Sequence, residues 1–248
     1  MNIYETDKLL SEYLLFHYAR AEDYLSYGFG PADALEYPRR CVDGWVDWSL
    51  LGTGGRALDL GCAVGRSTFE LARRGASALG IDYSRRFVDA AEQVRAGGAV
   101  TVRRFEEGDR FTEVRVERPQ GVDPGLVRFE AGDAMELRAD LGVFDVVLMA
   151  NLIDRLSDPR RCLDRMGGLV RAGGQLVVTS PYTWLEEFTP RAHWLGGTAD
   201  GQSTLEGLRA ALESAFELEK SGDVPFLIRE HARKYQWSVA QATVWRRR

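Results

Sequence analysis

The sequence has little of what marks secreted, membrane-bound or nucleic-acid-binding proteins. It has only three cysteines in 248 residues, without Cys-x-x-Cys spacing, which argues against a disulfide scaffold or a zinc site and favours a reducing compartment. No N-terminal apolar run resembles a signal peptide, and none is long enough to span a bilayer. The net charge of −5 provides no basic face for nucleic acid. We therefore expect a soluble, cytoplasmic protein without a metal site, and without nucleic-acid or membrane partners.

Two familiar nucleotide-binding loops are missing, but a related loop is present. Residues 56–66 read R-A-L-D-L-G-C-A-V-G-R, so a strand pattern containing Asp59 leads through Gly61 and Gly65 into a helix pattern. Ala63 replaces the second glycine of the dinucleotide fingerprint, and the Lys-Ser/Thr pair of a P-loop is absent. A strand–turn–helix of this kind indicates a nucleotide-like ligand at the carboxyl edge of a parallel sheet. The alternative is a tight turn that uses glycine for backbone reasons alone.

The rest of the chain alternates between strand and helix patterns. Strands are expected at 56–60, 77–82, 127–131, 144–149, 175–180, 216–221 and 235–245. Helices are expected at 65–74, from Ser84 onward, at 159–170 and near 204–214. Residues 1–52 should form an N-terminal helical cap, 99–118 an inserted β-hairpin and 181–202 an insertion on the substrate side. The prediction is one α/β domain over 1–248, with a Rossmann-like seven-stranded sheet and no internal repeat.

Three further polar signals follow the predicted strands. Asp82 ends the second strand about twenty residues after Gly61, where a carboxylate can accept from both hydroxyls of a ribose. A helix cap is the simpler alternative for Asp82. Asp133 follows the third strand in Gly-Asp-Ala, and Asn151 follows the fourth. The strand ends therefore carry acidic and amide groups at one edge of the sheet.

Together the four signals resemble the motifs of class I S-adenosylmethionine-dependent methyltransferases. The resemblance implies S-adenosylmethionine as cofactor, with Asp59 and the loop at its methionine end, Asp82 at the ribose and Asp133 near the adenine. The implied cofactor-binding residues are Asp59, Gly61, Cys62, Ala63, Gly65, Arg66, Asp82, Tyr83, Asp133, Ala134 and Asn151. A dinucleotide oxidoreductase is the alternative, but Ala63 and the Gly-Asp-Ala signal disfavour it.

A finer resemblance depends on three segments that are rich in aromatic residues. Residues 2–18, 179–190 and 225–237, with the glycine loop, look like the C-terminal methyltransferase domain of ovothiol synthase. That family domain methylates a ring nitrogen of 5-thiohistidine, also called 4-mercaptohistidine. The family's sulfoxide-synthase part is absent from this sequence. The resemblance therefore implies a free-standing enzyme that acts on a thiohistidine, or its selenium analogue, made by a separate sulfoxide synthase.

The acceptor side is predicted from the same segments. Candidate catalytic residues are Asn151, Tyr182 and His17. Candidate substrate-binding residues are Tyr4, Phe16, His17, Asn151, Arg155, Tyr182, Trp184, Glu186 and Arg229. Simpler interpretations remain open: a core stripe for Phe16, a structural histidine for His17, packing for Trp184 and a solvated face for Arg229. Alternative functions are methylation of another small amino acid or thiol, on sulfur for example, or a non-catalytic role beside a sulfoxide synthase.

Overall fold

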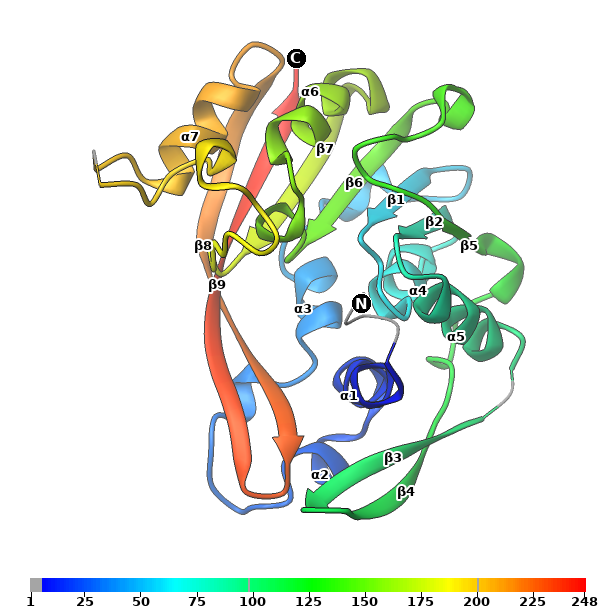
Figure 1. The fold of residues 1–248 in the computed structure, drawn as a ribbon. Coiled ribbons are helices and arrows are strands. Elements are labelled where there is room, and N and C mark those ends of the chain that lie inside the picture. The colour runs from blue at the N-terminus through cyan, green and yellow to red at the C-terminus, as the bar shows by residue number, and fades with distance from the viewer. Residues whose placement is uncertain (1–5, 98, 200) are drawn as a thin grey trace.

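The computed structural model, which describes residues 6–97, 99–199 and 201–248, is built around a seven-stranded sheet (Figure 1). The strand order is β5-β2-β1-β6-β7-β9-β8. The parallel strands are β1 (Arg56–Leu60), β2 (Ser77–Asp82), β5 (Val127–Ala131), β6 (Phe144–Ala150) and β7 (Val170–Ser180). The strand β9 (Lys234–Arg247) runs antiparallel to both β7 and β8 (Phe216–His231). The expected Rossmann-like α/β fold is therefore confirmed.

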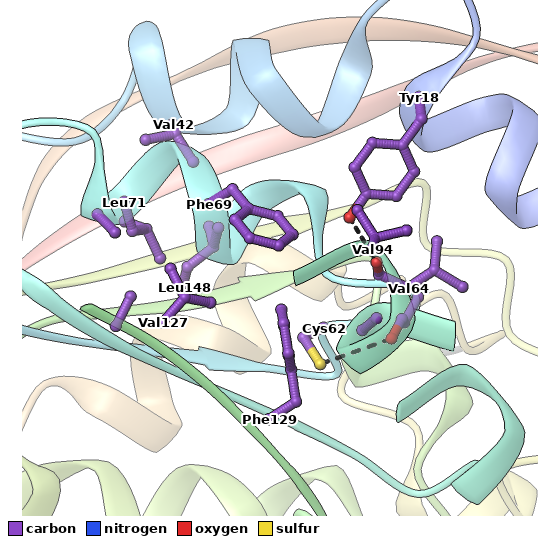
Figure 2. Packing of buried hydrophobic residues seen from close by; sticks show 14 of the residues in the cluster. Tyr18, Val42, Cys62, Val64, Phe69, Leu71, Val94, Val127, Phe129 and Leu148 are labelled. Carbon is purple, nitrogen blue, oxygen red and sulfur yellow. Dashed lines mark hydrogen bonds between the residues drawn. The ribbon is translucent and has the colours of Figure 1, made fainter. Parts of the chain in front are cut away.

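Helices cover both faces of this sheet. Successive side chains of each strand point to opposite faces, so one strand contributes residues to both buried clusters. On one face, residues of α4 (Arg66–Ala72) and α5 (Arg85–Arg95) belong to the same buried cluster as Val146 and Leu148 of β6; Figure 2 shows part of this cluster. On the other, residues of α6 (Pro159–Leu169) and α7 (Thr204–Leu212) share a cluster with Val147 and Met149. The central strands are apolar throughout because both of their faces are buried.

A helical cap precedes the sheet and lies below its carboxyl edge in Figure 1. It contains α1 (Asp7–Tyr18), α2 (Ala21–Tyr24) and α3 (Tyr37–Asp43). The last part of the cap is not one continuous helix, since α3 ends at Asp43 and a separate 3₁₀ helix covers Trp48–Leu50. The Tyr18 hydroxyl donates to the Val64 carbonyl at 2.6 Å, which ties α1 to the loop after β1 (Figure 2).

The sequence predicted the first of the two long hairpins, β3–β4, better than the second, β8–β9. The inserted hairpin of β3 (Val100–Glu107) and β4 (Arg110–Val116) is confirmed. The prediction that the sixth strand ends at Ser221 is wrong, because β8 continues ten residues further, to His231. Pro225 does not interrupt β8, which is the outermost strand and can accommodate a residue without an N–H. The strand expected at 175–180 begins five residues earlier, because β7 starts at Val170, directly after the helix that ends at Leu169.

The tips of the two hairpins meet beside α2 (Figure 1). The Ala232 N–H donates to the Glu106 carbonyl at 3.1 Å. The Tyr24 hydroxyl donates to the Leu227 carbonyl at 3.0 Å. The cap, the inserted hairpin and the β8–β9 hairpin therefore form one connected structure around α1.

Candidate active site

The loop after β1 is shaped by left-handed backbone conformations. Gly61 has φ = 78° and Gly65 has φ = 90°. A Cβ on Gly65 would lie 2.5 Å from the Phe129 ring, and one on Gly61 would lie 2.8 Å from Leu152 Cδ1. Both glycines are therefore required by space as well as by backbone angle.

Residues with strained, left-handed backbone conformations lie at the carboxyl edge of the sheet. Among the described residues, four that are not glycine have positive φ: Glu36, Ala63, Asn151 and Tyr182. The last three lie within three residues of the ends of β1, β6 and β7. Strained backbone is often retained where ligands are held, so this edge is the best candidate for a site.

Asp82 is fixed at this edge by two backbone donors. Its Oδ2 accepts from the Ala63 N–H at 2.8 Å, and its Oδ1 accepts from the Ser84 N–H at 2.8 Å. The helix cap of α5 is Ser84, whose hydroxyl accepts from the Phe87 N–H. Asp82 therefore joins the glycine loop to the end of β2, with a partly exposed carboxylate beside the strained Ala63.

Asp59 lies beneath the same loop and is almost completely buried. Its Oδ2 accepts from the Thr68 hydroxyl at 2.7 Å, while its Oδ1 has no hydrogen-bond partner among the described residues. Burial, with a further contribution from the negative charge of Asp82, raises the pKa of Asp59 to about 7. An unpaired buried carboxylate oxygen is costly, and a cationic or hydrogen-donating ligand group would satisfy it.

Replacing Asp59 with asparagine should remove a pH-dependent loss of stability. Because folding raises the pKa of Asp59, the folded protein binds more protons than the unfolded chain between pH 3.8 and about 7. As the pH rises from 3.8 to about 7, the unfolding free energy of the wild type should fall relative to that of Asp59→Asn, by up to about 1.4 kcal/mol per pH unit. Above this window the difference should stay constant. Denaturant unfolding without ligand measures both free energies. A difference between wild type and variant that does not change with pH would contradict the raised pKa of Asp59.

His17 links the cap to the start of α4. Its Nδ1 accepts from the Arg66 N–H at 3.3 Å, and its carbonyl accepts from Arg66 Nη1 at 3.1 Å. Burial and the nearby Arg66 charge lower the pKa of His17 to about 3, so the ring is neutral near pH 7. Arg66 is also paired with Glu70 at 2.7 Å. The structure thus gives His17 a linking contact, and its catalytic role stays a prediction.

Asn151 and Tyr182 stand at the ends of β6 and β7, each with a partner from a distant part of the chain. The Asn151 Oδ1 accepts from the Tyr37 hydroxyl at 2.7 Å. The Tyr182 hydroxyl donates to Gln241 Oε1 at 2.8 Å. Phe16 stacks on Tyr37 with ring centroids 6.0 Å apart. The cap therefore brings an aromatic pair onto the amide at the sheet edge.

Several other predicted acceptor residues make internal contacts instead. Trp184 is buried, donates to the Thr204 hydroxyl at 2.9 Å and stacks on Trp194. Arg155 donates to the Thr183 carbonyl at 3.0 Å, and Glu186 is exposed. Tyr4 lies outside the described residues.

The solvated face considered for Arg229 is wrong. Arg229 is 2% exposed and donates from Nη2 to Glu106 Oε2 at 2.8 Å. Its Nη1 donates to the Phe105 carbonyl at 2.6 Å. The guanidinium therefore joins the two hairpins, and binding of substrate by Arg229, as predicted, would have to compete with that ion pair.

The remaining cofactor candidates surround Asp82 and the loop. Cys62 is buried and Ala134 nearly so, whereas Tyr83 is 70% exposed beside Asp82. Asp133 accepts from the Met135 N–H at 2.8 Å and is half-buried. Among the described residues, no group of three His, Cys, Asp or Glu side chains is arranged to hold a metal ion.

Sequence reasoning missed three residues of this region. Tyr37 and Gln241 contact the predicted Asn151 and Tyr182 only through the tertiary fold. Asp154 is buried, and its Oδ1 has no partner in the described part of the chain. Its position in Asn-Leu-Ile-Asp-Arg, directly after the fourth predicted strand, was the one signal that could have identified it.

Comparison with known families and curated proteins agrees with the geometry. Residues 58–176 match the family described as "Methyltransferase domain". A ubiquinone biosynthesis O-methyltransferase of Cupriavidus pinatubonensis is 26% identical over 137 residues, which are 55% of this chain and 45% of that protein. A magnesium-protoporphyrin O-methyltransferase of Rhodobacter capsulatus is 34% identical over 57% of this chain and 55% of its own length. The chain thus spans about half the length of the curated relatives it matches.

Solved structures share the fold at low sequence identity. A methyltransferase from Methanosarcina mazei has a TM-score of 0.54 and 17% identity, covering 80% of this chain and 95% of its own. The N-methyltransferase NodS of Bradyrhizobium japonicum, in complex with S-adenosyl-L-homocysteine, has a TM-score of 0.51 and 16% identity, covering 85% of this chain and 83% of its own.

None of the helices in the described ranges is long and apolar enough to cross a membrane.

Proposed function

We propose that this protein is an S-adenosylmethionine-dependent methyltransferase that methylates a ring nitrogen of 5-thiohistidine or its selenium analogue. The match of residues 58–176 to the methyltransferase domain family supports the first part of this proposal. The observation that carries the methyltransferase part is the Asp82 carboxylate, held beside the strained Ala63 by two backbone N–H groups. Such a carboxylate, at the end of β2 beside the glycine loop that follows β1, suits a ribose.

The residues present fit the cofactor at both ends. The unpaired Oδ1 of Asp59 is suited to the ammonium of a methionine moiety, which is cationic and rich in donors. Gly61 and Gly65 fix the conformation of the loop, because a Cβ at either position would meet Leu152 or Phe129. Tyr83 and Asp133 would then border the adenosine. When bound, S-adenosylmethionine supplies a methyl group activated by its sulfonium charge.

The choice of acceptor rests on where the three family-like segments lie. Residues 6–18 are α1 and its cap, residues 179–190 follow the end of β7, and residues 225–237 form the tip of the β8–β9 hairpin. The cap places Phe16 against Tyr37 and Phe226, and Tyr37 against Asn151. Phe16 of the first segment and Phe226 of the third therefore both contact Tyr37, which donates to Asn151 at the carboxyl edge, and this supports a role for these segments in binding one small aromatic acceptor.

The residues of this edge are suited to alignment rather than to strong base catalysis. The thiol of a thiohistidine ionises readily, so its imidazole is already electron-rich. Transfer from a sulfonium is an in-line displacement that depends on orientation. Phe16, which is half-buried, can pack on the ring, while Asn151 and Tyr182 can hydrogen-bond its edge. His17, with a pKa of about 3, does not contribute a positive charge.

An acceptor panel tests this function. The purified protein is incubated with S-adenosylmethionine and 5-thiohistidine, histidine or cysteine, and products are measured by mass spectrometry. We expect a methylated product, with stoichiometric S-adenosylhomocysteine, from 5-thiohistidine and at most traces from the other two. Turnover of cysteine or histidine instead would support methylation of another small amino acid. Cofactor binding without turnover of any acceptor would support a non-catalytic role beside a sulfoxide synthase.

A further inference from the structure

Asn151 belongs to a polar cluster with two hydroxyl groups, one of them from the cap. Its Oδ1 accepts from the Tyr37 hydroxyl at 2.7 Å and from the Thr179 hydroxyl at 3.3 Å. The two hydroxyl oxygens lie 2.7 Å apart. The Asn151 backbone is fixed as well, because its N–H donates to the Thr179 carbonyl at 2.8 Å.

This arrangement determines which end of the amide is available. The Tyr37 hydroxyl donates to Asn151 Oδ1 and the Thr179 hydroxyl lies 3.3 Å from the same atom, so the carbonyl end of the amide is held within the cluster. The amide nitrogen lies on the opposite side of the same planar group. No hydrogen bond from this nitrogen is found among the described residues. Asn151, which is half-buried with φ = 51°, is therefore arranged to present hydrogen-bond donors to a ligand.

Tyr37 is held too firmly to turn away from the amide. It is 2% exposed, and its ring packs against Phe226 at 4.9 Å and Phe16 at 6.0 Å between centroids. It lies at the first position of α3, directly before Pro38. The cap thus controls the orientation of an amide at the carboxyl edge of the sheet.

We infer that Tyr37 is a positioning residue, and that it orients the Asn151 amide so that its nitrogen donates to a lone pair of the methyl acceptor. The acceptor group at this point is then a hydrogen-bond acceptor, such as a thiolate or an unprotonated ring nitrogen, and not an ammonium or an N–H. The inference rests on the proposed function. On a thiohistidine, this contact would help to decide whether nitrogen or sulfur faces the methyl group.

The test compares Tyr37→Phe with a matched loss of a hydroxyl elsewhere in the cap. Tyr27→Phe is the control, because the Tyr27 hydroxyl donates to the Ala232 carbonyl near the hairpin tips and not to the sheet edge. We expect Tyr37→Phe to raise the KM for 5-thiohistidine about tenfold, the effect of about 1.4 kcal/mol, and to increase the fraction of S-methylated product. Its Kd for S-adenosylmethionine should stay within about twofold of the wild type.

Asn151→Asp provides the second variant, because it keeps the shape and removes both donors. It should raise the KM for the acceptor more than Tyr37→Phe does. Wild-type KM and product ratio in Tyr37→Phe would overturn the inference while leaving the proposed function standing. Loss of S-adenosylmethionine binding in Tyr37→Phe would also overturn it, since that indicates a general structural role.

An NMR experiment without the methyl acceptor distinguishes failure of the proposed function from failure of the positioning role of Tyr37. The side-chain amide signals of Asn151 in the NMR spectrum are assigned by their absence in Asn151→Asp. Tyr37→Phe should shift them and Tyr27→Phe should not. If the wild type does not methylate 5-thiohistidine, the proposed function fails, and unshifted amide signals in Tyr37→Phe would then overturn the positioning role as well.

Discussion

Asp82→Ala should weaken the binding of S-adenosylmethionine by about 1–3 kcal/mol, or about 5- to 150-fold. The substitution removes the acceptor proposed for the ribose hydroxyls. It also removes the two hydrogen bonds that the Asp82 carboxylate accepts from the Ala63 and Ser84 N–H groups, each at 2.8 Å. Both losses act on the same loop, so the effect should exceed that of a simple surface contact. Isothermal titration of the purified variant measures the affinity.

Two further variants make this result specific. Asp89→Ala removes a carboxylate from the exposed side of α5 and should leave the affinity within about twofold of the wild type. Asp82→Asn keeps one carbonyl oxygen and should fall between the wild type and Asp82→Ala. Equal affinity for the wild type and Asp82→Ala would refute the ribose role, provided that the variant unfolds at the same denaturant concentration.

Gly65→Ala should destabilise the protein by about 2–5 kcal/mol, the sum of two costs. A residue with a side chain at φ = 90° is strained by about 1–2 kcal/mol. The new Cβ would also lie 2.5 Å from the Phe129 ring and 3.1 Å from Ala91 Cβ, and overpacking of this kind costs about 1–3 kcal/mol. Denaturant unfolding without ligand measures the change.

Gly54→Ala separates these costs. Gly54 has φ = 86°, but a Cβ there would meet no atom within 4 Å. It should show only the backbone cost of about 1–2 kcal/mol. Combining Gly65→Ala with Phe129→Leu should recover part of the stability, since the smaller side chain gives way. Equal losses for Gly54→Ala and Gly65→Ala would show that contact with Phe129 does not make Gly65 necessary.

The sequence predicted best what depends on local pattern. The strand ends at Leu60 and Asp82 and the N-cap at Ser84 lie where expected, because alternation and capping are properties of a few adjacent residues. The glycine loop was recognisable for the same reason. Its demand for glycine could only be measured in three dimensions, where Phe129 and Leu152 occupy the space beside it.

What the sequence could not supply depends on contacts across long separations. Tyr37 meets Asn151 across 114 residues, and Arg229 meets Glu106 across 123. No local pattern distinguishes such partners from other aromatic or charged residues. The continuation of β8 past Pro225 was missed because only its place at the edge of the sheet makes proline acceptable there.

The most direct test of the account is to locate the transferred methyl group. The wild-type protein is given S-adenosylmethionine with a ¹³C-labelled methyl group and 5-thiohistidine, and the product is examined by carbon–proton correlation NMR. We expect a methyl signal with the chemical shift of an N-methyl group, coupled across the ring nitrogen to imidazole carbons. A methyl signal with the shift of a thioether, coupled only to the carbon that bears sulfur, would contradict it.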